Sequence, residues 1–196
     1  MKVKFISLAS GSSGNCYYLG TETYGILIDA GIGIRTIKKS LKDYNILMDS
    51  IRAVFITHDH ADHIKAVGNL GEKMNIPVFH DDQHGTAIVV CAALVNALKL
   101  AEKQNPTIVI NGAGSAGVAI ATLILKIGLG NVILVDKQGI LTADMDLTSG
   151  QRGLIDKLNK EGKTGSLKDA LVGADVFIGV SAGHIVSKEM IASMNE

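Results

Sequence analysis

The chain has 196 residues, of which 47% are apolar, and its 19 basic residues equal its 19 acidic ones, so the formal net charge is zero. This length suffices for one large domain or two small ones with a real hydrophobic core. The neutral balance leaves no basic field that would favour nucleic acid, and no Lys/Arg-rich amphipathic stretch favours a membrane surface. Cys16 and Cys91 lie far apart, which argues against a disulfide framework and favours a reducing, cytoplasmic environment.

The first part of the chain predicts short strands separated by Gly/Ser and Thr/Glu turns. These elements are strands at residues 2–8, 15–20, 25–29 and 53–57, a helix at 33–41, a helix that follows the strand at 53–57 and runs through about residue 75, and a strand at 76–79 with the sequence IPVF. The last strand–helix–strand segment is a βαβ unit, for which a right-handed crossover is expected.

The second part predicts a strongly apolar helix from Gly85 to about Gln104, followed by buried parallel strands at 107–111, 131–136 and 175–180 with helical stretches between them. The longest apolar run, residues 87–98, is predicted to be too short to span a bilayer and to form a buried core helix. We expect the α/β class, with a single mixed, mostly parallel sheet and helices on both of its faces.

Four metal-ligand residues, His58, His60, Asp62 and His63, follow the strand at 53–57 within six positions. In an extended segment residues i and i+2 point the same way, so His58 and His60 can bind one ion, while Asp62 and His63 turn toward a second. The mixture of imidazole and carboxylate favours zinc, iron or manganese over calcium. In the alternative interpretation Asp62 caps the helix and the histidines form a polar loop.

This motif, together with the stretches SLASGSSGN (residues 7–15) and LIDAG (27–31), resembles the N-terminal part of the metallo-β-lactamase-fold hydrolases over residues 1–78. The resemblance implies the following metal ligands and supporting groups: His58, His60 and His63 as ligands, Asp62 for the second ion, and Asp29 as a buried supporting carboxylate. It also implies an incomplete site, because the family's remaining ligands come from later strands and the sequence changes family after residue 79.

The segment GAGSAG, from Gly112 to Gly117, fits the G-x-G-x-x-G pattern between a strand and a helix. Gly112 permits the tight turn, Gly114 lets the backbone approach a pyrophosphate, and Gly117 allows the helix to pack closely on the strand. Asp136 ends the next strand, where a carboxylate binds ribose hydroxyls and repels a 2′-phosphate, so NAD is expected rather than NADP. The alternative is a glycine-rich turn without a ligand. The expected cofactor contacts in the loop are Gly112, Gly114, Ser115, Ala116 and Gly117.

Asp81 and Asp82 follow the IPVF strand and precede the apolar helix. Adjacent carboxylates at the end of a strand suit Mg²⁺ or Mn²⁺, although the same pair is typical of an ordinary helix-capping turn.

The combination FHDDQHGTA, NGAGSAG, VILVDKQG and VFIGVSAG over residues 76–196 resembles the front of the NAD-binding domain of malic enzymes, which oxidise and decarboxylate malate to pyruvate. The resemblance implies that Asp82 is a metal ligand, that Asp81 is its catalytic neighbour, and that Ser181 and Ala182 lie on the nicotinamide side of the cofactor. The family's catalytic tyrosine and lysine and its Glu-Asp metal pair have no counterpart here, so little or no malate turnover is expected.

We interpret the chain as a fusion of a partial metallo-β-lactamase-like module, residues 1–78, with a partial Rossmann-like module, residues 79–196. The first functional hypothesis is an NAD- and divalent-metal-binding, malic-enzyme-like protein that takes a malate-like small molecule. The alternatives are a metal-dependent hydrolase of the metallo-β-lactamase fold and a non-enzymatic chimera. Uncovered apolar surface on the truncated sheets and on the helix at 87–98 predicts a homo-oligomer.

The junction between the two modules predicts a hybrid site. The carboxyl ends of parallel neighbouring strands lie at the same edge of a sheet, so His58, His60 and Asp62 should lie near Asp81 and Asp82. His80 and His84 are expected close by, and two imidazoles with Asp82 would hold one transition-metal ion.

Overall fold

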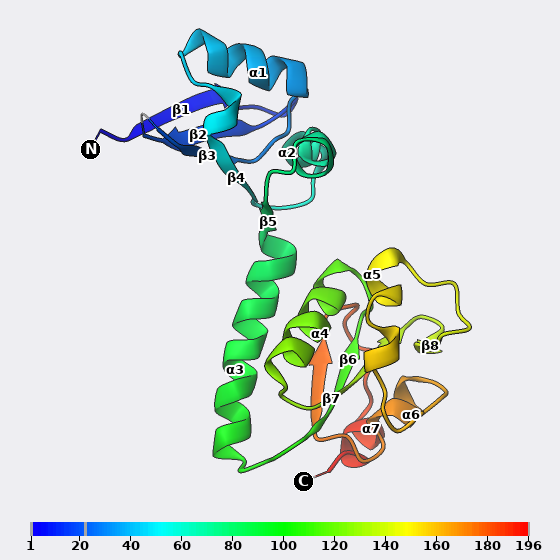
Figure 1. The fold of residues 1–196 in the computed structure, drawn as a ribbon. Coiled ribbons are helices and arrows are strands. Elements are labelled where there is room, and N and C mark those ends of the chain that lie inside the picture. Colours follow the sequence, from blue (N-terminus) through cyan, green and yellow to red (C-terminus); the bar gives the residue numbers. More distant parts are fainter. Residues whose placement is uncertain (1, 22, 196) are drawn as a thin grey trace. The chain divides into compact units, whose positions relative to one another are not determined.

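The computed structural model describes residues 2–21 and 23–195, which divide into two compact units at residues 1–82 and 83–196 (Figure 1). The first unit holds a five-stranded sheet in the order β1-β2-β3-β4-β5, and the second holds a four-stranded sheet in the order β8-β7-β6-β9. The α/β class is therefore confirmed, but the expectation of a single sheet is wrong. Strand β5 has three residues and ends the first sheet, and the next strand, β6, pairs with β7 and β9 instead.

The elements of the first unit are β1 (Lys4–Ala9), β2 (Cys16–Gly20), β3 (Gly25–Ile28), α1 (Ile34–Asp43), β4 (Ile51–Ile56), α2 (Ala61–Ile64) and β5 (Val78–His80). Strands β1, β2 and β3 pair antiparallel, whereas β3, β4 and β5 pair parallel. A 3-10 turn at Met48–Ser50 and a π-helical turn at Asn69–Lys73 complete the unit.

One face of the first sheet carries the core of this unit. Helix α1 buries Ile37 and Leu41, which lie four residues apart and therefore on the same side of the helix. They pack with alternate strand residues such as Tyr18, Leu27 and Val54, all of which are at most 1% exposed. The strand residues between these point to the opposite face, where none is buried. Within the described residues of this unit, helices therefore cover one face of this sheet and not both.

The elements of the second unit are α3 (Thr86–Leu100), β6 (Thr107–Asn111), α4 (Ser115–Ile127), β7 (Asn131–Asp136), β8 (Gly139–Ile140), α5 (Ser149–Arg152), α6 (Leu167–Leu171), β9 (Val176–Gly179) and α7 (Lys188–Ala192). Strand β6 is parallel to both β7 and β9, and β8 is antiparallel to β7. From β6 the chain continues to β7 on one side and later to β9 on the other side, so the strand order reverses at β6. In open α/β sheets, ligands bind at the carboxyl end of such a switch point.

Helices cover both faces of the second sheet, as expected. On one face Ile108 packs in a core with Ile120 of α4, and on the other Val109 packs in a core with Leu171 of α6. All five residues of β6 are buried, which is the pattern of a strand in a parallel sheet with two covered faces.

Helix α3 differs from its expected burial. It buries Ala87, Cys91 and Leu94, whereas Val89 is 69% exposed and Leu100 is 89% exposed. The prediction of a buried core helix is wrong, because the helix is apolar all round and only one of its faces packs in the core. With the preceding turn it forms a 20-residue helical segment, Asp81–Leu100, which by length and composition could cross a membrane. The core helices of soluble proteins pass the same test, so the length and composition of this segment are weak evidence for a membrane span.

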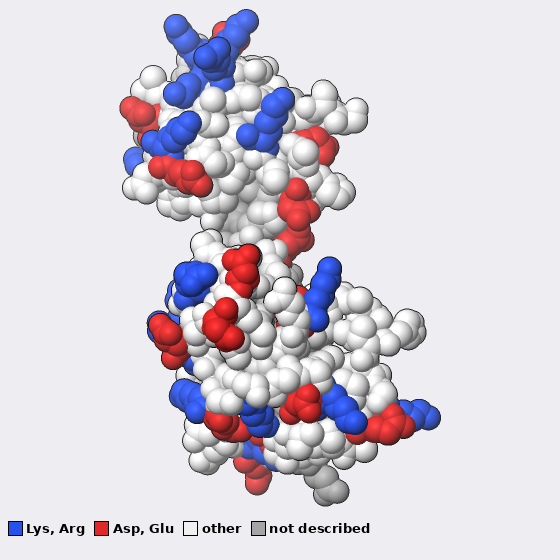
Figure 2. Space-filling view, turned by 90° about the vertical axis from the view of Figure 1, so that its right-hand side faces the viewer, with Lys and Arg blue, Asp and Glu red and all other residues white. Residues whose placement is uncertain are grey.

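Charged side chains of both signs occur in each unit. On the face drawn in Figure 2, Lys and Arg residues gather at the top of the first unit, and charges of both signs lie among one another over the rest of the face. The formal net charge of the whole sequence is zero.

Candidate functional site

The histidine cluster lies at the carboxyl end of β4, in the loop that leads into α2. Parallel pairing of β3 with β4 brings this loop beside the end of β3. The ring of His58 lies 3.9 Å from the ring of His63 and 4.6 Å from the ring of His60, measured between centroids. The structure thus brings together the three histidines that the sequence singled out.

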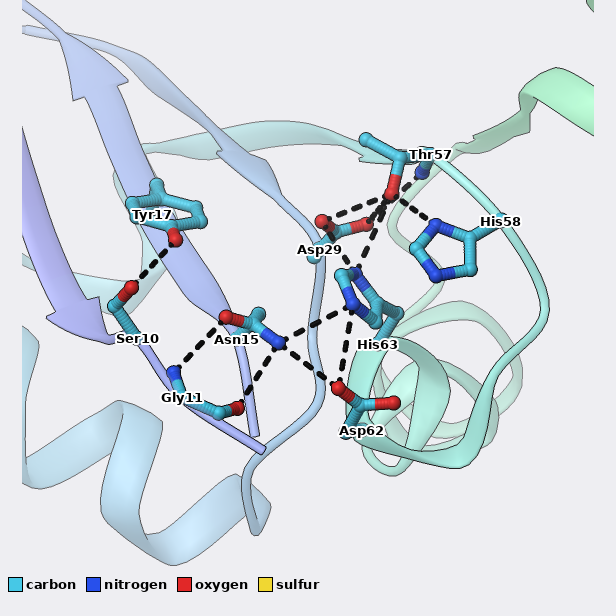
Figure 3. Close-up of polar contacts among 9 residues, drawn as sticks. All are labelled: Ser10, Gly11, Asn15, Tyr17, Asp29, Thr57, His58, Asp62 and His63. Atoms are coloured by element: carbon cyan, nitrogen blue, oxygen red, sulfur yellow. Dashed lines mark hydrogen bonds and ion pairs between the residues drawn. The ribbon is translucent and has the colours of Figure 1, made fainter. Parts of the chain in front are cut away.

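Asp29 lies between Thr57 and His63 and anchors this cluster (Figure 3). Its carboxylate is 2% exposed and accepts hydrogen bonds from the Thr57 amide at 2.9 Å, from the Thr57 hydroxyl at 3.0 Å and from His63 Nδ1 at 2.8 Å. Asp29 itself has a φ of +58°, a left-handed conformation that is uncommon for a residue other than glycine. Because a carboxylate accepts, the proton of His63 lies on Nδ1, and Nε2 presents a lone pair on the opposite side of the ring.

Asp62 and Asn15 face that lone pair. His63 Nε2 lies 3.4 Å from Asp62 Oδ2, and the Asn15 side-chain amide reaches the two atoms at 3.2 Å and 3.0 Å. Two atoms bound to one tetrahedral zinc at about 2.0–2.1 Å lie about 3.4 Å apart. The pair His63–Asp62 therefore fits one ion of the zinc type.

A third ligand does not complete this pair. Within residues 2–21 and 23–195, no three His, Cys, Asp or Glu side chains are arranged so that they could hold a metal ion. The cluster thus fits a metal through two atoms only.

Backbone contacts hold the loop against the ends of β2 and β3. The amide of Asn15 donates to the carbonyl of Asp62 at 2.8 Å, and the amide of Ala30 donates to the carbonyl of His63 at 2.7 Å. At Gly31 a Cβ atom would collide with the carbonyl oxygen of Asp62. The glycine of the LIDAG stretch is therefore needed for this close approach, which the sequence alone does not reveal.

Cys16 lies beside this site but does not belong to it. Burial, and secondly the negative charge of Asp29, raise the pKa of the Cys16 thiol to about 12. The thiol therefore stays protonated at neutral pH.

The acidic pair at the end of β5 does not join the histidines. Asp81 and Asp82 open the π-helical turn Asp81–Gly85, and both are exposed. Strand β5 is parallel to β4, so the two loops do leave the same sheet edge. No metal-holding group of three His, Cys, Asp or Glu side chains forms there within the described residues. The predicted hybrid site of His58, His60 and Asp82 is therefore wrong, because a shared sheet edge alone does not bring these side chains to one point.

The glycine loop, residues 112–117, joins β6 to α4 at the switch point of the second sheet. Gly112 has a φ of +114°, and a Cβ there would lie 2.6 Å from the Val180 carbonyl oxygen. At Gly117 a Cβ would collide with the carbonyl oxygen of Gly112, so helix and strand pack together only without a side chain. Gly114, in contrast, faces open space and precedes the first turn of α4. Each glycine thus has the geometry that its expected role requires.

A cavity connects this loop to Asp136 at the end of β7. It measures about 300 Å³, and its lining includes Gly114, Asp136, Met145 and Gln151. Asp136 is partly exposed, and one of its carboxylate oxygens accepts a hydrogen bond from the Lys137 amide at 2.8 Å. The N-terminus of the 13-residue helix α4 therefore opens beside a cavity that ends at a carboxylate.

Gln151 is a site residue that the sequence did not point out. Its side chain is 5% exposed, and its Nε2 donates to the carbonyl of Ala113 within the glycine loop at 2.8 Å. Its Oε1 accepts from the Thr148 amide at 2.9 Å, which closes a capping box at the start of α5. The pattern T-x-x-Q is the signal that could have revealed this helix start, although not the contact with the loop.

The Ser181–Ala182 segment follows β9 at the same edge of the sheet. Asn111, the last residue of β6, donates from Nδ2 to Ser181 Oγ at 2.6 Å, and the Val180 amide donates to the Asn111 carbonyl at 2.9 Å. The structure therefore places Ser181 next to the glycine loop. Ser115 and Ala116 form the first turn of α4 in the same region.

Comparisons with known proteins give two likenesses. Residues 9–145 match the family model of the metallo-β-lactamase superfamily, a match that runs past the first unit. The chain is also 46% identical over 129 residues to a bifunctional malic/malolactic enzyme of Bacillus subtilis, and 37% identical over 129 residues to an NADP-dependent malic enzyme of Escherichia coli. Each alignment covers 64% of this chain, and it spans 32% and 17% of the two relatives.

A solved structure gives the same likeness. The crystal structure of an NAD-dependent malic enzyme from Thermotoga maritima superimposes with a TM-score of 0.66 at 39% identity, covering 85% of this chain and 44% of that one. This share of the chain is larger than the second unit, so the likeness extends into the first unit.

Proposed function

Because residues 9–145 match its family model, the chain belongs to the metallo-β-lactamase superfamily, and from its second unit we propose that it is a malic-enzyme-like protein that binds NAD. The observation that carries the proposal is the cavity that joins Gly114 of the glycine loop to Asp136. A dinucleotide-binding unit needs this pairing of a phosphate-binding loop with a ribose-binding carboxylate. The likeness of the chain to malic enzymes supports it.

Different residues of the chain would bind different parts of NAD. The open space at Gly114 and the amides at the start of α4 would receive the pyrophosphate, together with Ser115 and Ala116. The carboxylate of Asp136 would accept hydrogen bonds from the ribose hydroxyls, and Ser181 and Ala182 would lie on the nicotinamide side. The bound cofactor supplies hydride-transfer chemistry, whereas the protein supplies binding and orientation.

Isothermal titration with NAD and NADP tests this proposal. We expect NAD to bind more tightly, because the Asp136 carboxylate repels a 2′-phosphate, and Asp136→Ala to weaken NAD binding by at least about tenfold. Asp156→Ala is the matched control, since Asp156 is an exposed aspartate that does not line the cavity. A preference for NADP, or an Asp136→Ala variant that binds NAD as well as the wild type, would overturn the proposal.

Malate decarboxylation by this chain should be absent or very slow. Asp81 and Asp82, the expected catalytic neighbour and Mg²⁺ or Mn²⁺ ligand, are exposed and belong to no metal-holding group within the described residues. A turnover number within the usual enzyme range of about 1 to 1000 per second in the presence of malate, NAD and Mn²⁺ would contradict this expectation.

A second candidate function is metal binding at the histidine cluster, carried by the 3.4 Å separation of His63 Nε2 and Asp62 Oδ2. We propose these two atoms as ligands of a zinc-type ion, with His58 and His60 as the nearest further imidazoles. An ion there would activate water for hydrolysis. Zinc titration of the wild type and of His63→Ala, read by calorimetry, tests the proposal. If neither zinc nor NAD binds, the chain is a folded chimera without either function.

A further inference from the structure

The outer face of the first sheet is apolar, and no described helix of the same unit covers it. Parallel and antiparallel pairing aligns one row of residues across all five strands, namely Ser7, Tyr17, Ile28, Phe55 and Phe79. None of these side chains is buried, and Phe55 is 40% exposed. We call the face formed by this row and the adjacent one the open sheet face.

The adjacent row on this face is also apolar and exposed or half-buried. It aligns Phe5, Leu19, Ile26 and Ala53, none of which is buried, and Phe5 is 65% exposed. The two rows contain no charged residue. The face of a sheet that meets water normally carries polar residues. An apolar face without charges is therefore typical of a surface that another layer covers.

Within the described residues of this unit, the helices do not supply the cover. Helix α1 and the helical turns between β4 and β5 pack on the other face, against Tyr18, Leu27 and Val54. In Figure 1, α1 is drawn above the strands of this unit and α2 to their right.

We propose that the open sheet face is the dimerisation surface of the protein, and that it packs against the same face of a second copy. The proposal is independent of the NAD and metal sites. Two copies meet there without burying any charge from either row, whereas a partner with a charged surface would lose the hydration of its charges. The identical uncharged face is available on every molecule of the chain.

The distribution of ring side chains makes this face complementary to itself. Phe5 stacks on Tyr17 at one margin, with centroids 5.9 Å apart, and Phe55 lies against Phe79 at the other, with centroids 5.4 Å apart. The smaller side chain of Ile28 lies between the margins. A twofold axis parallel to the strands and above β3 would place each aromatic margin over the opposite margin of the partner, in face-to-face sheet packing.

The size of the face predicts a reversible dimer. Five strands at about 4.8 Å spacing span roughly 24 Å, and five residues along a strand span roughly 16 Å. A flat area of roughly 400 Å² per chain corresponds to a total buried surface on the order of 1,000 Å², at the low end for specific interfaces. We therefore expect association that depends on protein concentration in the micromolar range.

Sedimentation velocity of the full chain over a range of concentrations tests the proposal. The wild type should shift from monomer to dimer, and Phe5→Glu and Phe55→Glu should each weaken the dimer by at least about tenfold, because the new carboxylate would be buried without a partner. Leu47→Glu is the matched control: Leu47 is 76% exposed in the same unit but lies outside the face, and this variant should dimerise normally.

Val89→Glu separates this surface from the exposed side of helix α3, where Val89 is 69% exposed. A dimer that is lost in Val89→Glu and kept in both phenylalanine variants would overturn the proposal, as would a wild type that stays monomeric at every concentration. The melting temperature of the wild type gives a test that needs no variant. It should rise with protein concentration if a dimer forms, and a constant value would contradict the proposal.

Discussion

Replacing Asp175 with asparagine should destabilise the second unit in a pH-dependent way. Asp175 lies just before β9, and its carboxylate accepts hydrogen bonds from Lys103 Nζ at 2.9 Å, from the Thr107 amide at 2.8 Å and from Asn195 Nδ2 at 3.0 Å. It therefore links the segment after α3, the start of β6, the start of β9 and the C-terminal end. The side chain is 13% exposed, so solvent screens these contacts little.

The magnitude follows from the pKa of this group. Partial burial acts to raise the pKa of Asp175, but the hydrogen bonds from Asn195, Lys103 and Thr107 outweigh it and lower the pKa from 3.8 to about 2. A lowering of nearly two pH units corresponds to about 2 kcal/mol of folding free energy. Because the folded pKa is depressed, this stabilisation is fully present above pH 4 and is lost as the pH falls from about 4 to about 2.

Urea unfolding of the wild type and of Asp175→Asn, followed by far-ultraviolet circular dichroism, measures this effect. At neutral pH the variant should lose about 2 kcal/mol, and the difference should shrink toward pH 2. Asp156→Asn is the control, since Asp156 is exposed in the same unit. All four tyrosines lie in the first unit, so tyrosine fluorescence reports that unit separately. Equal losses in the two variants, or a difference that does not change with pH, would refute this reasoning.

Three further substitutions test the sites. Gln151→Met should weaken NAD binding by about tenfold, because a buried carbonyl of the glycine loop loses its donor. The same variant should leave adenosine binding unchanged, since adenosine lacks the pyrophosphate. Equal losses for both ligands would indicate a merely structural role. Gly117→Ala should abolish NAD binding in titration, because its Cβ would collide with the Gly112 carbonyl; normal affinity would contradict the close packing. Asp29→Asn should weaken zinc binding about 10- to 100-fold through the histidine it orients, and unchanged zinc affinity would count against that role.

Several local features were predictable from sequence, because each depends on neighbouring residues. The strand at 107–111 and the strand at 131–136 have the predicted bounds, since continuous β-branched and aliphatic runs are typical of parallel strands with two covered faces. The three glycines of the loop have the expected geometry, because a strand, a tight turn and a helix leave little other choice at those positions.

Contacts between distant segments could not be predicted in the same way. The capping box of Gln151 is a local pattern, but its hydrogen bond to Ala113 joins residues 38 positions apart. The support of the histidine loop by Gly31 is likewise visible only when β3 lies beside β4. The hybrid site was wrong for the same reason, since a shared sheet edge does not determine where individual side chains meet.

The sequence by itself thus determined the local elements and the chemical character of the two candidate sites, because turn residues, ligand types and apolar runs act over a few positions. Only the tertiary structure decided that the chain forms two sheets, and that helices cover both faces of the second but one face of the first. The sequence around an apolar residue such as Phe55 or Val89 does not show whether its side chain is buried or exposed. Its burial depends on which other segment packs over it, and that is a property of the folded chain.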